Sequence, residues 1–71
     1  MTKMDVMAAR QLAAAEFGFS RWLIGIERAE KNRRGDFTMI RFHVKTRQRN
    51  TPAKYTMVKN SLGRWELMVI G

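Results

Sequence analysis

The stretch Phe37-Thr38-Met39-Ile40-Arg41-Phe42-His43-Val44-Lys45-Thr46-Arg47 decides the fold of this chain. Its side chains alternate with a period of two, which is typical of a β-strand with one face on a core and the other in solvent. The core positions are Thr38, Ile40, Phe42, Val44 and Thr46, and the opposite positions Arg41, His43, Lys45 and Arg47 form a basic row. The sequence therefore predicts a central strand with cations on its outer side.

A strand is also expected before this one. In residues 21–27, Trp22, Ile24 and Ile26 fall on one side, and Gly25 marks a bulge or a close approach of the backbone. The polar residues 30–36, with the turn signal Gly35-Asp36, connect it to the central strand as a hairpin.

Two more strands are expected after the central one. Pro52 keeps residues 48–53 out of a central strand, so this segment is predicted to be a loop. Residues 54–59 and 64–70 then alternate as strands, joined by a tight turn at residues 60–63.

Residues 2–17 predict a helix. Thr2 is a suitable N-cap, Asp5 three residues later approaches a capping box, and Gly18 is suited to end the helix in the left-handed conformation. Helical spacing puts Met4, Met7, Ala8, Leu12 and Ala15 on one face. The expected fold is α+β: an N-terminal helix packed on a four-stranded antiparallel meander, with a three-stranded sheet as the competing layout.

Size and composition indicate one small domain over residues 1–71. Of these residues 45% are hydrophobic, which is enough for a packed core, and the chain has no cysteine for a disulfide or a zinc site. The lack of cysteine suits a reducing, cytoplasmic setting. No apolar run reaches the roughly 20 residues of a membrane span, and the N-terminus resembles neither a signal nor a transit peptide.

One helix about 10 Å wide is too narrow to cover a sheet of four strands about 4.8 Å apart. Part of the apolar set Trp22, Ile24, Phe42, Trp65, Leu67 and Val69 is therefore expected to stay uncovered. The sequence predicts a two-fold homodimer that covers it, with a strongly twisted monomer as the alternative.

Charge is the strongest global signal. Fourteen Lys and Arg oppose six Asp and Glu, which gives a formal net charge of +8. The isoelectric point is near 11.2, and nine of the fourteen cations are Arg, which suits two-pronged contact with phosphate. We therefore expect a non-enzymatic nucleic-acid-binding module, with DNA and RNA equally compatible.

The expected binding residues lie on the basic face of the sheet and in the hairpin loops. Cations two residues apart on a strand repeat at roughly 6.6 Å, near the spacing of phosphates along a nucleic-acid strand. Phe37, Met39 and Tyr55 are expected on the same face, where Phe37 or Tyr55 would stack on bases or pack on each other. The predicted set is Arg33, Arg34, Arg41, His43, Lys45, Arg47, Arg49, Lys54, Tyr55 and Phe37.

Catalysis is not expected. His43 is the one histidine and has cations as neighbours, the six carboxylates are scattered, and the five glycines are isolated from one another. We expect no catalytic residue, no metal site and no cofactor. One helix also disfavours a helix-turn-helix motif.

Two other functions stay open. The chain has the size and simplicity of small accessory proteins carried by phages and mobile elements. Such a protein would act as an inhibitor or adaptor, docking its basic face on an acidic protein surface or adding a strand to a neighbour's sheet. The other possibility is a purely structural dimeric subunit.

Overall fold

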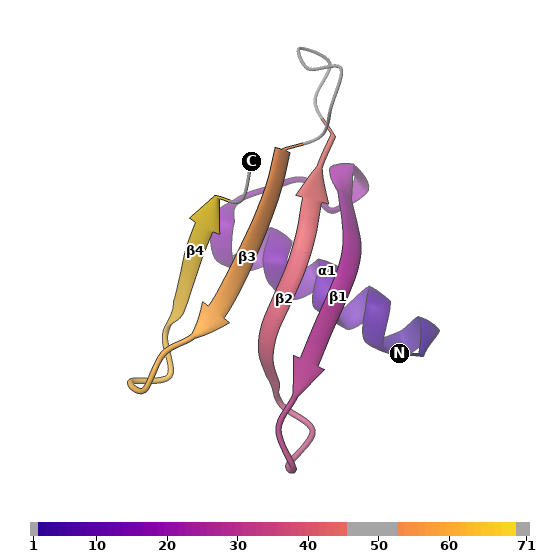
Figure 1. The fold of residues 1–71 in the computed structure, drawn as a ribbon. Helices are drawn as coiled ribbons and strands as arrows, with labels where there is room; N and C mark the ends of the chain where they lie inside the picture. The colour runs from indigo at the N-terminus through magenta and orange to yellow at the C-terminus, as the bar shows by residue number, and fades with distance from the viewer. Residues whose placement is uncertain (1, 46–52, 70–71) are drawn as a thin grey trace.

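The computed structural model describes residues 2–45 and 53–69. Helix α1 spans Lys3–Phe17 and a short 3-10 helix, η1, spans Arg21–Leu23. Strands β1 (Ile24–Lys31), β2 (Phe37–Val44), β3 (Ala53–Lys59) and β4 (Trp65–Val69) follow. They form one antiparallel sheet in the order β1-β2-β3-β4, with α1 on one side (Figure 1). The predicted α+β fold with four strands is confirmed.

Both ends of α1 carry the expected capping groups. The Oγ1 of Thr2 accepts from the backbone N–H of Asp5 at 3.1 Å, and the Asp5 carboxylate accepts from the N–H of Thr2 at 3.3 Å. At the other end Gly18 has φ of 73°, a conformation that only glycine adopts at little cost. Its N–H donates to the carbonyl of Ala14 at 3.0 Å, so the helix ends where the sequence predicted.

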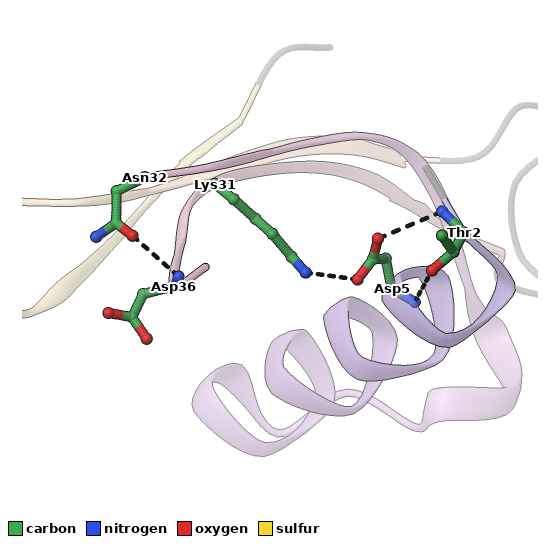
Figure 2. A network of polar contacts seen from close by, with 5 residues as sticks. All are labelled: Thr2, Asp5, Lys31, Asn32 and Asp36. Carbon is green, nitrogen blue, oxygen red and sulfur yellow. Dashed lines mark hydrogen bonds and ion pairs between the residues drawn. The ribbon is translucent and has the colours of Figure 1, made fainter. Parts of the chain in front are cut away.

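Asp5 also ties the start of α1 to the sheet. Its second carboxylate oxygen lies 2.5 Å from the Nζ of Lys31 at the end of β1 (Figure 2). The Lys31 ammonium, together with the Thr2 hydroxyl and N–H, holds the pKa of Asp5 below its usual value. The side chain of Lys31 is thereby committed to this contact.

The face of α1 that packs on the sheet differs from the predicted one. Ala9 and Ala13 are fully buried, whereas Met4, Met7, Ala8 and Ala15 are exposed. Leu12 is the one predicted member that packs partly against the core. The helix carries apolar residues all round, so periodicity does not single out a face. Two alanines make the contact because they let the helix approach the strands closely.

The core centres on β2. Ile40, Phe42 and Val44 are buried there, with Ile24 from β1 and Met57 from β3. The Phe42 ring stacks on Tyr55 at a centroid distance of 5.5 Å, and Phe19 packs on Phe42 at 6.0 Å. The apolar residues of β2 therefore point to the core, as predicted.

The segment before β1 is the main departure from the predicted strands. Residues 21–23 turn as η1, so Trp22 does not join Ile24 and Ile26 on the core side and is 80% exposed. β1 then continues to Lys31, through residues predicted to belong to the connection. Register shifts between Ile26 and Arg28 and between Glu30 and Lys31 let it follow the twist of β2.

The two hairpin turns use the same chemistry. Asn32 and Asn60 each accept, through Oδ1, from the backbone N–H groups two and four residues later, at 2.9 and 3.0 Å. Gly35 and Gly63 sit three residues after each Asn with φ of 87° and 78°. Both turns lie at the same end of the sheet, the end at which β1 and β3 finish (Figure 1). They share the pattern Asn-x-x-Gly, a repeat that the sequence contains.

The helix leaves part of its side of the sheet open, as its width predicted. It packs on β1 and β2. On β4, Val69 lies opposite Tyr55 and therefore on the helix side, yet 72% of it is exposed. Over the part of the chain that the structure describes, no helix has the length and apolar character to cross a bilayer.

Candidate nucleic-acid interface

The sheet face opposite α1, here called the outer face, collects cations from three strands. Arg41 on β2 lies directly opposite Arg28 on β1, and His43 lies directly opposite Lys54 on β3. Directly opposed residues point to the same side of a sheet. Lys45 follows two residues after His43, and its N–H donates to the carbonyl of Leu23 at 2.9 Å. We call the set Arg28, Arg41, His43, Lys45 and Lys54 the Arg41 cluster.

Carboxylates neutralise part of this cluster. Glu30 lies 3.1 Å from Arg28, and Glu27 lies 3.8 Å from Lys54. Within residues 2–45 and 53–69, Arg41 and Lys45 have no carboxylate oxygen within 4.0 Å. Both paired cations are more than half exposed, so solvent screens these ion pairs. The centre of the outer face therefore keeps unmatched positive charge.

The His43 imidazole lies over Gly25 of β1. A Cβ added to Gly25 would lie 2.3 Å from both Cε1 and Nε2 of His43. The sequence predicted a bulge or a close approach at Gly25, and the structure has the close approach there. The ring is thus held against the sheet, between the positions of Arg41 and Lys45.

The remaining predicted cations do not join the cluster. Arg33 and Arg34 are exposed in the β1–β2 turn, at the opposite end of β2 from Lys45 (Figure 1). Phe37, where β2 begins, is already about 13 Å along the strand from Arg41. Met39 and Glu30 occupy the outer face in between. Arg47 and Arg49 lie outside the described residues.

The two predicted stacking residues lie on the other face. Tyr55 is directly opposite Phe42, and its ring lies 5.4 Å from that of Phe19 on the helix side. Phe37 packs against the core because the register shift after Glu30 places it opposite Lys31, whose Nζ is 5.0 Å from its ring. Placing Phe37 and Tyr55 beside Arg41 was wrong, whereas Met39 does lie on the outer face, opposite Glu30.

The structure has a groove between α1 and η1 that the sequence did not predict. It has a volume of about 230 Å³ and is lined by Met7, Arg10, Gln11, Arg21 and Trp22. The Arg21 guanidinium lies 4.7 Å from the centre of the Trp22 ring. The run Trp22-Leu23-Ile24 breaks strand alternation, and this was the signal in the sequence that Trp22 leaves the strand. We call this site the Trp22 groove.

The described residues contain no group of three His, Asp or Glu side chains that could hold a metal ion. Comparison of the chain with protein-family models, curated proteins and solved structures found no match. The outer face and the groove are therefore the two surfaces that bear on function.

Proposed function

We propose that this chain is a non-enzymatic module that binds nucleic acid in the cytoplasm, through the phosphate backbone, with the Arg41 cluster as its contact surface. The observation that carries the proposal is the position of Arg41. It is exposed on the sheet face opposite α1, directly opposite Arg28, and no described carboxylate matches it.

Stability of the fold does not account for that arrangement. Like charges directly opposite each other destabilise an antiparallel pair. Glu30 relieves Arg28 at 3.1 Å, but no carboxylate among residues 2–45 and 53–69 compensates the charge of Arg41. A polyanion on the outer face would compensate it, and Arg offers the planar donor pair that phosphate accepts well.

The shape of the surface also favours an extended ligand. Arg41, His43 and Lys45 follow one another at two-residue intervals of roughly 6.6 Å, and Arg28 and Lys54 flank them on strands about 4.8 Å away. Such a row tracks a chain of phosphates instead of enclosing a single ion. Contacts to phosphate give affinity without reading sequence.

Binding of labelled oligonucleotides, measured by anisotropy at several salt concentrations, tests the proposal. Affinity is expected to fall steeply with salt, and Arg41→Gln is expected to lower the slope of log K against log salt by about 0.7–0.9, the loss of one phosphate contact. Arg64→Gln is the matched control, because Arg64 is an exposed Arg in the distant β3–β4 turn.

Equal effects of Arg41→Gln and Arg64→Gln would reject the Arg41 cluster as the contact surface. Binding of one acidic protein without affinity for any oligonucleotide would instead favour the inhibitor or adaptor, whose basic face docks on a protein. Thermal melting of each variant, followed by circular dichroism, separates a binding defect from unfolding.

A further inference from the structure

We infer that the Trp22 groove accepts an unstacked base, so that the preferred ligand is single-stranded nucleic acid. This inference rests on the proposed function and adds the class of nucleic acid. It replaces Phe37 and Tyr55, which face the helix side, with an aromatic side chain that is free to stack.

The ring of Trp22 is available to a ligand. It is 80% exposed and lies outside the packed core. Single exposed apolar residues are common and need no function. Trp22 differs because it lines a groove, and because Arg21 holds a guanidinium 4.7 Å from its ring centre. Base stacking on an aromatic ring beside a cation is the general device of single-strand binding.

The size of the groove fits one part of a larger ligand. Pockets for whole drug-sized ligands measure roughly 300–1,000 Å³. At about 230 Å³ the Trp22 groove is smaller, so it suits one planar group of a polymer. Met7 and Trp22 supply apolar surface, and Gln11 supplies an amide that can donate to and accept from a base edge.

The charge of the groove selects an anionic ligand. Arg10 and Arg21 both line it, and neither has a carboxylate within 4.0 Å among the described residues. The Nε of Arg10 is buried and has no hydrogen-bond partner in that same part of the chain. A buried donor without a partner costs free energy, and reorientation of the Arg10 guanidinium would let it donate to an acceptor of the ligand.

The groove lies on the helix side of the sheet, round the β1 edge from the Arg41 cluster, because α1 supplies three of its five lining residues. Leu23, the residue after Trp22, accepts a hydrogen bond from the N–H of Lys45, the last cation of the cluster that the structure describes. η1 and the end of β2 lie at the same end of the sheet (Figure 1). A single strand whose phosphates follow β2 would pass round the edge of the sheet at β1 to place its next bases in the groove, a path that a flexible strand can take, whereas paired bases in a duplex stay stacked inside the helix.

Tryptophan fluorescence and anisotropy test the inference, recorded with oligothymidylate, oligouridylate and a blunt DNA duplex in a Trp65→Phe background, which leaves Trp22 as the one tryptophan. Both single strands are expected to quench Trp22 and to bind more tightly than the duplex. Trp22→Ala is expected to weaken single-strand binding roughly ten- to a hundred-fold and to leave duplex binding unchanged. Trp22→Phe keeps a stacking ring and should retain most of the affinity, and Leu62→Ala is the control for loss of an exposed apolar side chain.

The outcomes separate the two proposals. If Arg41→Gln weakens binding but Trp22→Ala does not, the groove is not a base site and the proposed function stands. If no oligonucleotide binds, both proposals fail. Quenching of Trp22 by an acidic peptide, and by none of the oligonucleotides, would assign the groove to a protein partner and would also overturn the inference.

Discussion

The imidazole of His43 on β2 lies directly over the backbone of Gly25 on β1, so close that a Cβ on Gly25 would come within 2.3 Å of two ring atoms. The two residues are cross-strand partners on the outer face. Because Gly25 has no side chain, the ring of the only histidine of the chain can lie against β1.

This contact predicts a coupling between the two positions. In a His43→Ala background, Gly25→Ala should stabilise the protein by about 0.5–1 kcal/mol, because alanine loses less backbone entropy in a strand than glycine. With His43 present, the new methyl group displaces the ring and the gain is expected to vanish. A double-mutant cycle from urea melts measures the coupling, and strictly additive effects would contradict the contact.

The capping carboxylate of Asp5 predicts a pH dependence. Lys31 and Thr2 lower the pKa of Asp5 in the folded state, so its contribution is present above the unfolded value of about 3.9 and is lost as pH falls through the folded value. Asp5→Asn should therefore lower the urea midpoint at neutral pH, and the difference from the parent should shrink at about pH 2.5. Asp36→Asn is the control, since Asp36 forms no ion pair within the described residues. A difference that is the same at both pH values would be inconsistent with this account.

The end of α1 predicts a purely backbone effect. Gly18 has φ of 73°, and the space around its Cα is open, with nothing within 4 Å of an added Cβ. Gly18→Ala is expected to cost about 1 kcal/mol of unfolding free energy, because the left-handed conformation is strained for alanine. Gly18→Asn should cost less, since Asn tolerates this conformation better. Equal stability of the alanine variant and the parent would show that the helix ends in another way.

The paired turns predict equal losses at two distant positions. Asn32→Ala and Asn60→Ala each remove an Oδ1 that accepts from two backbone N–H groups. Each substitution should lower the unfolding free energy by roughly 1–2 kcal/mol. Asn32→Asp keeps the acceptor and most of the stability, whereas Asn60→Asp should keep less, because Nδ2 of Asn60 donates to Oε1 of Glu66 at 3.3 Å and a carboxylate there would repel it. Thermal melting measures all four, and no loss in either alanine variant would mean that Gly35 and Gly63 suffice.

The open part of the helix-side face bears on the predicted homodimer, which stays a prediction. Val69 is 72% exposed there. We expect sedimentation equilibrium to give the mass of a dimer at micromolar concentration and Val69→Lys to shift the protein to the monomer. A monomer mass for the parent at every concentration would exclude the dimer.

The sequence predicted the helix and the strands well, but it predicted the direction of their side chains only in part. Thr2, Gly18 and the alternation around Phe42 act locally, so their roles can be read from neighbouring residues. That Tyr55 faces the helix side could not be read in this way, because it depends on how β3 pairs with β2 across a long connection, and a shift of one residue reverses the face.

The candidate site was predicted only in part, because some of its residues come together through pairing and packing between distant parts of the chain. Arg41, His43 and Lys45 share one strand, so their common face followed from the period of two. Arg28 joins them only through the bulge at Ile26–Arg28, and the Trp22 groove depends on the packing of η1 against α1, which no local pattern reports.

In both hairpins the asparagine and the glycine hold the turn, so the two residues between them contribute side chains that the fold does not use. Positions 33 and 34 in one turn, and 61 and 62 in the other, can therefore carry labels or foreign residues. Since both tips extend from the same end of the sheet (Figure 1), a pair of spin labels at Arg34 and Ser61 would report how far the sheet twists when its outer face is occupied.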